Sequence, residues 1–140
     1  MTTLRITRDM LDEGGYYLGT EFDGGATFDG SVVIEPGLGW VRFRGSLCVT
    51  GSLCAEAGSG IQAGEWIEAG EWIEAGWGIE AGLSVTCQNV LSVRLRVMAG
   101  TCLYRLPEEH ETVVTCGRFE GGTVAFGTLV ETGIEAEVAS

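Results

Sequence analysis

Residues 64–82 read GEWIEAGEWIEAGWGIEAG and contain three nearly identical hexapeptides. Each hexapeptide has an isoleucine followed by glutamate and alanine, and glycine begins the next one. Isoleucine and alanine two residues apart lie on one face of a β-strand, while the glutamate between them points to the other face. Glycine suits the corner after each strand because it has no Cβ. The stretch therefore predicts short strands and tight corners, with isoleucine and alanine facing inward.

The six-residue period extends well beyond this stretch. Counting in sixes from Phe43 to Val97 meets an apolar residue at every step, and a second column of small or apolar residues runs from Ala57 to Ala99. An α-helix would need apolar residues at i, i+3, i+4 and i+7, and each interior glycine would cost it about 1 kcal/mol. The pattern predicts an all-β solenoid of stacked coils.

These repeats resemble the hexapeptide β-helices, in which successive coils stack in parallel. In the left-handed family three hexapeptides form one triangular coil, which implies that residues about 18 positions apart stack on each other. Here alanine follows the aliphatic residue instead of preceding it, so the sequence leaves the handedness and the coil length open. The stacked columns expected on this basis are Ile61 with Ile79 and Val97, Val49 with Ile67 and Val85, and Ala55 with Ile73 and Leu91.

One domain accounts for all 140 residues. Residues 1–42 should contain a strand at LRIT, glycine-rich loops and a degenerate coil at SVVIEPG, offset by an insertion at residues 38–40. Residues 43–100 should form the hexapeptide β-helix. The period is lost in residues 101–140, which we expect to form a strand-rich cap with a hairpin turn at FEGG. Atypical ends of this kind protect the terminal edges of a solenoid.

The chain is strongly acidic, with 20 acidic and eight basic residues and a net charge of −12. This balance argues against direct binding to nucleic acid or to an anionic membrane, because both need clustered cations. It favours a basic protein partner, or solubility alone. No secretory signal and no long apolar segment is present, so we expect a soluble cytoplasmic protein.

The five cysteines are an odd number and include no CxxC pair. We expect reduced thiols that act as small buried side chains. These cysteines are Cys48, Cys54, Cys87, Cys102 and Cys116.

Six glutamates and no basic residue lie between Arg44 and Arg94. With three hexapeptides in each coil, Glu56 and Glu74 would share a column, where like charges destabilise a sheet by about 0.2–1 kcal/mol. One interpretation is a solvated protective surface. The other is a carboxylate array whose repulsion is relieved by a cationic groove. The candidate binding residues are Glu56, Glu65, Glu68, Glu71, Glu74 and Glu80.

Three tryptophans accompany these glutamates. Trp66 and Trp72 precede their isoleucines, so strand alternation turns both indoles outward. With Trp77 they could anchor a partner, since exposed indoles are enriched at protein interfaces. Alternatively, the indoles pack against the ends of the solenoid or against each other.

The sequence offers little for catalysis, and we expect neither a cofactor nor a metal site. The sole histidine, His110, lies in an acidic segment outside the repeat, and its neighbours Glu108, Glu109 and Glu111 are poorly spaced for a metal cage. No phosphate-binding loop, nucleophile elbow or zinc-protease motif is present. We therefore expect a non-enzymatic protein.

The GxxIEAG array, followed by LRVMAGTCLYR and a short strand-rich tail, resembles small proteins of phages and mobile elements, among them anti-CRISPR proteins. The resemblance covers roughly residues 45–130. It implies an inhibitor that binds the basic groove of a host nucleic-acid-binding defence complex in the bacterial cytoplasm. Its carboxylates would mimic phosphates, because a ladder of stacked glutamates could approach the DNA charge density of one per about 1.7 Å. The cap could support a homodimer. The alternative is a structural or self-assembling β-helix whose coils join end to end.

Overall fold

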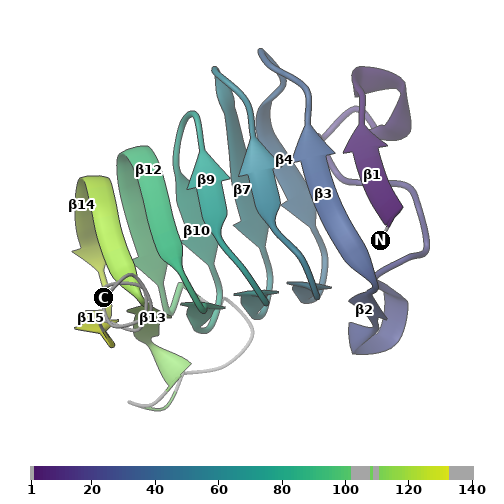
Figure 1. Cartoon of the computed structure of the whole chain (residues 1–140). Coiled ribbons are helices and arrows are strands. Elements are labelled where there is room, and N and C mark those ends of the chain that lie inside the picture. Colours follow the sequence, from purple (N-terminus) through teal and green to yellow (C-terminus); the bar gives the residue numbers. More distant parts are fainter. Residues whose placement is uncertain (1, 102–107, 109–110, 133–140) are drawn as a thin grey trace.

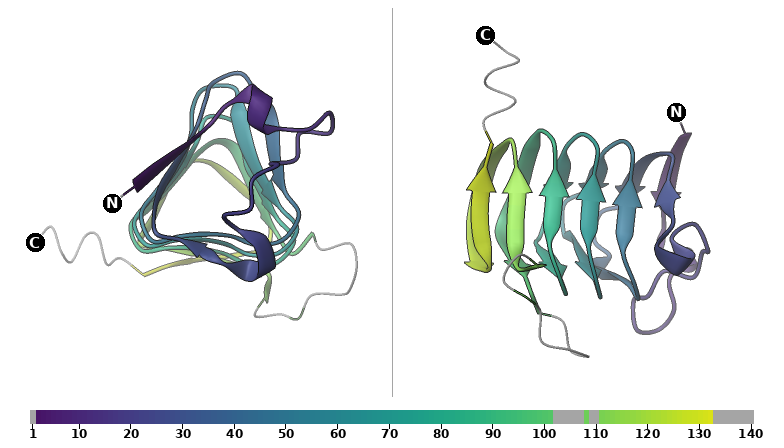
Figure 2. Two further views of the ribbon diagram at one scale, coloured as in Figure 1. Left: turned by 90° about the vertical axis from the view of Figure 1, so that its right-hand side faces the viewer. Right: turned by 90° about the horizontal axis from the view of Figure 1, so that it is seen from below.

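The computed structural model describes residues 2–101, 108 and 111–132 of the chain. The strands stack side by side from the N-terminal to the C-terminal end (Figure 1). Seen along the stack, the chain traces a triangle, so the molecule is a three-sided prism (Figure 2). All pairings between named strands are parallel. The predicted all-β solenoid is therefore confirmed.

Each side of the prism is a row of parallel strands. The first face contains β2 (Thr27–Phe28), β5 (Leu47–Val49), β8 (Ile67–Ala69), β11 (Val85–Cys87), β13 (Val113–Cys116) and β15 (Thr128–Glu131). The second face contains β1 (Thr2–Ile6), β3 (Gly30–Ile34), β6 (Leu53–Ala55), β9 (Ile73–Ala75) and the first halves of β12 (Val90–Ala99) and β14 (Arg118–Phe126). The third face contains β4 (Gly39–Phe43), β7 (Ser59–Ala63), β10 (Ile79–Ala81) and the second halves of β12 and β14. Two short 3₁₀ helices, η1 (Arg8–Met10) and η2 (Asp23–Gly25), lie in the N-terminal segment.

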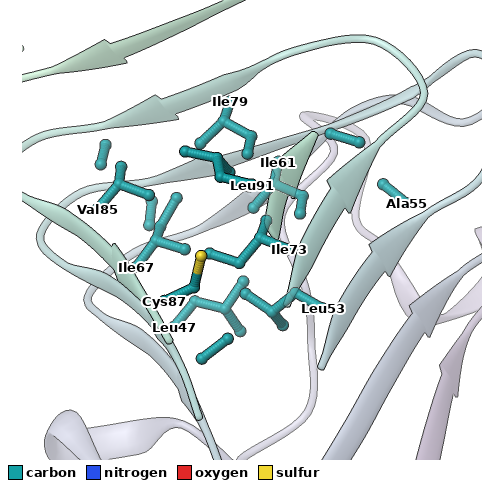
Figure 3. Close-up of a cluster of buried hydrophobic side chains, with 14 of the residues drawn as sticks. Leu47, Leu53, Ala55, Ile61, Ile67, Ile73, Ile79, Val85, Cys87 and Leu91 are labelled. Atoms are coloured by element: carbon teal, nitrogen blue, oxygen red, sulfur yellow. The ribbon is translucent and has the colours of Figure 1, made fainter. Parts of the chain in front are cut away.

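The interior is built by the predicted isoleucine and alanine columns (Figure 3). Ile61, Ile79 and Val97 pair in one column, so each turn of this part consists of three hexapeptides. Ile67 pairs with Val85 in the same way. These aliphatic side chains are completely buried. Each buried isoleucine or leucine contributes about 1.5–3 kcal/mol through removal from water, which makes the columns the main source of stability.

The other expected columns need a correction of two residues. Val49 pairs with Ala69 rather than with Ile67, and Ala55 pairs with Ala75 rather than with Ile73. The aliphatic positions in this coil belong instead to Leu47 and Leu53, which pair with Ile67 and Ile73. The cause is an enlarged corner at residues 56–58, which makes this coil longer than three hexapeptides.

A two-residue offset keeps the core intact. Side chains alternate with a period of two along a strand, so a shift of two returns every side chain to the same face. Counting in sixes from Phe43 therefore passes from the alanine column to the isoleucine column between Ala55 and Ile61 without meeting a polar residue.

The N-terminal region forms a coil of its own, as expected. LRIT lies mostly in β1, and SVVIEPG supplies most of β3, which pairs with both β1 and β6. The extra residues form a corner at 35–38, before β4, so the insertion lies earlier than expected. Four aromatic rings fill this end of the prism: Tyr17, Phe22, Phe28 and Phe43.

The expected hairpin at FEGG is wrong, because these four residues lie inside β14. The two glycines serve close stacking instead. A Cβ on Gly121 would overlap the carbonyl oxygen of Val93, and one on Gly122 would overlap that of Leu95. The strands β13, β14 and β15 thus continue the parallel stack beyond residue 100.

Candidate partner-binding surface

The glutamates of the repeat form a girdle around one coil rather than a ladder along the prism. Glu68, Glu74 and Glu80 lie at the centres of β8, β9 and β10, one on each face. The corners before the first and second faces hold Glu65 and Glu71. The fold therefore distributes these carboxylates around the axis, because three successive hexapeptides make one turn.

The axial neighbours of the girdle are uncharged. Glu68 pairs with Cys48 and Thr86 on the adjacent strands. Glu74 pairs with Cys54 and Ser92, and Glu80 with Gln62 and Met98. The expected glutamate ladder is wrong because the IEA triplet occurs on all three strands of a single coil and not on the coils beside it.

Glu56 stands apart from the girdle. It lies at the enlarged corner and not in the column of Glu74, where Cys54 lies instead. Its carboxylate pairs with Arg5 at 3.3 Å, and Arg5 also pairs with Glu35 at 3.1 Å. The expectation of a belt without internal neutralisation therefore fails at Glu56. Sequence reasoning missed this pair because Arg5 lies 51 residues away and reaches Glu56 only through the stacking of β1, β3 and β6.

The three tryptophans are exposed, each beside a different strand. Trp66 is 37% exposed, Trp72 45% and Trp77 37%, so the predicted outward orientation of Trp66 and Trp72 is confirmed. They precede β8, β9 and β10, respectively. A flat partner on one face cannot cover all three together.

Trp77 also packs against a tryptophan that the sequence pattern did not single out. Its ring centre lies 5.7 Å from that of Trp40. The ring of Trp40 covers Gly60 and Gly78, where an added Cβ would come within 2.9 and 3.3 Å of the indole, respectively. The two glycines of adjacent coils were the available signal, because they leave space on the third face for a flat ring.

The repeated GEWIE sequence therefore produces two related surface patches. The first patch consists of Glu65, Trp66 and Glu68 and borders the first face. The second consists of Glu71, Trp72 and Glu74 and borders the second face. The two patches have the same chemistry but different surroundings.

The first patch lines a cleft of about 540 Å³ between the first face and the N-terminal segment. Tyr17, Phe22 and Phe43 supply aromatic surface to this cleft. Asp23 adds a further carboxylate, and the residues of the second patch are not part of the lining. A second cleft, of about 520 Å³, lies beside Trp40, Trp77 and Arg42.

Two side chains of β5 and its preceding corner hold the carboxylates of the first patch. The hydroxyl of Ser46 donates to Glu65 Oε1 at 3.4 Å, and the thiol of Cys48 donates to Glu68 Oε2 at 3.6 Å. Burial, followed by the negative charge of Glu68, raises the pKa of Cys48 to about 11. The thiol is therefore protonated near neutral pH and acts as a donor rather than a nucleophile.

The cysteines divide into two groups. Cys87 and Cys116 are buried in the interior, and burial raises their pKa to about 12 and about 11. Cys48 and Cys54 lie instead at outward positions of their strands, and Cys54 is only partly buried. All four are free thiols, as expected, and the expected burial holds for Cys48, Cys87 and Cys116 but not for Cys54. Cys102 lies outside the described residues.

Two further sequence expectations concern a metal site and a membrane-spanning segment. Within residues 2–101, 108 and 111–132, no group of three or more His, Cys, Asp or Glu is placed to hold a metal ion. No helix in the same part of the chain has the length and apolar character needed to cross a membrane. His110 lies outside the described residues.

Comparison with protein-family models, with curated proteins and with solved structures gives no match to this chain.

Proposed function

We propose that the protein is a non-enzymatic inhibitor that binds a basic groove of a nucleic-acid-binding defence complex in the bacterial cytoplasm. The observation that supports this most directly is the girdle of carboxylates. Among the described residues, Glu68, Glu74 and Glu80 form no ion pair with a basic side chain. Their charge is therefore available to a cationic partner.

The arrangement of the carboxylates around one coil limits how much of a nucleic acid the protein can mimic. A straight groove lying along one corner meets neighbouring carboxylates such as Glu65 and Glu68, together with one indole. Such a contact replaces a few phosphates and not a long stretch of duplex. The exposed tryptophans would then anchor the contact, because an indole contributes a large apolar area and a hydrogen-bond donor.

The test begins with retrieval of a partner from bacterial lysate on the immobilised protein. The purified partner is then bound to a DNA duplex, and its displacement by the protein is titrated at low and high salt. The triple variant Glu68→Gln, Glu74→Gln and Glu80→Gln should displace DNA at least about tenfold less well, and added salt should weaken the wild-type protein.

A charge-matched variant serves as the control. Asp9→Asn, Glu13→Gln and Glu120→Gln remove three charges from exposed positions outside the girdle. This variant should displace DNA as well as the wild-type protein. Equal loss in both variants, or salt-independent displacement, contradicts the proposal.

A structural or self-assembling β-helix is the second candidate, favoured by one observation at the C-terminal end. Phe126 in β14 is 53% exposed and Val130 in β15 is 43% exposed, although both strands belong to the stack. Apolar side chains at the end of a solenoid can join one copy to another. Light scattering across a range of protein concentrations separates the two candidates. The particles of a self-assembling protein become larger as its concentration rises, whereas those of an inhibitor keep a fixed size.

A further inference from the structure

The cleft beside the first patch has walls of two kinds. One side is the first face, where Ser46, Cys48 and Glu68 line it. The other side is the N-terminal segment around Tyr17, Phe22 and Asp23. Its volume of about 540 Å³ exceeds what one amino-acid side chain fills, so a side chain of a partner can enter with its adjoining backbone.

Aromatic rings build the inner part of this cleft. Phe43 contacts both Tyr17 and Phe22, with ring centres 5.6 and 5.5 Å apart, respectively. The Phe22 and Phe43 rings stand nearly perpendicular, at 85°, which fixes the packing of this cluster. Trp66 adds a partly exposed indole to the lining. Phe22 and Phe43 are themselves buried, so the rings open to the cleft are those of Trp66 and the half-buried Tyr17, and such rings attract cations through their quadrupole.

Carboxylates complete the lining, and side chains of the preceding coil hold two of them in place. Ser46 and Cys48 donate to Glu65 and Glu68, so two of the carboxylates are held against the first face. Asp23 adds the third from the N-terminal segment. A cation in the cleft would thus meet negative charge from two directions.

The basic residue of the cleft, Arg44, is held by other partners. Its guanidinium carbon lies 4.2 Å from the centre of the Tyr16 ring, and its nitrogen lies 3.5 Å from the carboxylate of Asp12. Neither Tyr16 nor Asp12 lines the cleft. In the described residues, Arg44 forms no ion pair with Glu68.

We infer that this cleft binds the guanidinium group of an arginine side chain. A guanidinium group is planar, so it can lie against an aromatic ring while its N–H groups pair with a carboxylate. Lysine offers a compact, strongly hydrated charge that matches such a lining less well. The inference rests on the proposed function only in assigning the arginine to the partner protein. The binding of the side chain itself can be measured without that partner.

The experiment uses the full chain and N-acetyl-L-arginine amide as the probe. The indole N–H signals of the tryptophans are followed by ¹⁵N-correlated NMR during titration. The expected result is a saturable shift of the Trp66 signal, with a Kd in the millimolar range, while the Trp72 signal stays unchanged. N-acetyl-L-lysine amide should bind at least about threefold more weakly.

The second GEWIE copy supplies the matched control. Glu68→Gln should weaken arginine binding at least about fivefold, whereas Glu74→Gln, the same change in the second patch, should leave it unchanged. Circular dichroism establishes that both variants are folded. Three results would overturn the inference: no saturable shift at Trp66, equal shifts at Trp66 and Trp72, or equal weakening by both variants. Lysine amide that binds as tightly as arginine amide would overturn the assignment to guanidinium.

These results are separable from the proposed function. If the protein displaces DNA from a partner but arginine amide does not bind at Trp66, only the cleft inference is wrong. If arginine amide binds at Trp66 but no partner releases its DNA, only the inhibitor proposal is wrong.

Discussion

Two adjacent coils of the prism reach the same shape with chain segments of different length. The longer coil runs from Val41 to its axial partner Ile61, and the shorter one runs from Ile61 to its partner Ile79. The difference lies in one corner, because five residues separate Ala55 from Ile61 in the longer coil, whereas three separate their partners Ala75 and Ile79 in the shorter one. The comparison shows that strands and their inward columns fix the fold, while a corner can accept additional residues.

The longer corner is itself ordered by its neighbour. Gly58 has a φ of +79°, a conformation that favours glycine. The amide of Gly37, in the enlarged corner of the preceding coil, donates to the carbonyl of Ala57, and the amide of Gly39, at the start of β4, donates to that of Gly58. The two enlarged corners thus support each other, whereas the compact corner at Gly76 bonds directly to Ala55.

The largest expected effect comes from the inward column that both coils share. Ile73 pairs with Leu53 of the longer coil and Leu91 of the next, and it is completely buried. Ile73→Ala should lower the free energy of unfolding by about 2–5 kcal/mol, measured by urea denaturation, because it leaves a cavity between coils. Its outward neighbour is the control, since Glu74→Ala should change stability by less than about 0.5 kcal/mol. Similar losses for both would show that the columns do not dominate stability.

A compact corner should be nearly as sensitive. A Cβ at Gly70 would overlap the carbonyl oxygen of Thr50 in the preceding coil, so Gly70→Ala should destabilise the protein by about 3 kcal/mol. At Gly45 the nearest atom would be 3.5 Å away, an ordinary contact. Gly45→Ala should therefore fall within about 0.5 kcal/mol of the wild type, as measured by thermal and urea unfolding. If the two alanine variants prove equally stable, close coil stacking is not what requires glycine at Gly70.

Shortening the longer corner tests the comparison itself. Deletion of Ala57 and Gly58 gives this coil the spacing of the regular one but removes the acceptors of Gly37 and Gly39. The variant should remain folded, with a loss of about 2 kcal/mol for two hydrogen bonds, measured by urea denaturation. The circular dichroism spectrum should keep its β character. A completely unfolded variant would mean that the enlarged corner is essential and not merely accommodated.

A smaller effect is expected at alkaline pH in the coil that follows the shorter one, where Cys87 pairs with Ala69. Burial, and then the neighbouring Cys116, raises the pKa of Cys87 from 9.0 to about 12. The unfolded thiol therefore ionises first, so the stability that the neutral thiol provides is present below pH 9.0 and is lost as the pH rises toward 12. In Cys87→Ala, stability should fall less steeply across this range, as measured by urea denaturation at several pH values. Thr86→Ala, which changes an outward residue that does not titrate, should retain the wild-type slope.

The smallest effect is expected at the surface pairs of Arg5. Arg5 is 53% exposed where it pairs with Glu35 and Glu56, so water screens both contacts. Arg5→Ala should lower stability by less than about 1 kcal/mol, and the difference from the wild type should shrink as salt is added. A larger loss that persists at high salt would indicate that Arg5 supports the longer corner through packing.

The sequence predicts this fold well wherever the hexapeptide is regular. The Ile61, Ile67 and Ile73 columns follow from the period together with the three-hexapeptide coil that the resemblance implies, because each corner there has the same length. The enlarged corner at residues 56–58 could not be located, since a two-residue offset moves one apolar column onto another and leaves the hydrophobic pattern unbroken. FEGG was misassigned for a related reason: paired glycines favour a turn in isolation but here permit close stacking within a strand.

The candidate surface was less predictable than the core. The outward direction of Glu68 and Trp66 follows from strand alternation. Their arrangement around one coil depends on how many strands complete a turn, which the repeat leaves open. The cleft beside them was missed entirely, because it needs Tyr17 and Phe22 from a segment without the repeat.

The regular coil also has a bearing on how such a chain can lengthen during evolution. Ile61 stacks with Ile79 and Ile67 with Val85, so one turn is a whole number of hexapeptides and its two ends match. A tandem duplication of residues 64–81 would add one complete turn, with each isoleucine placed on its own copy. The same event would place Glu68 on Glu68 and Trp66 on Trp66. A single duplication would thus turn the ring of carboxylates into ladders along all three faces, while the interior kept its present contacts.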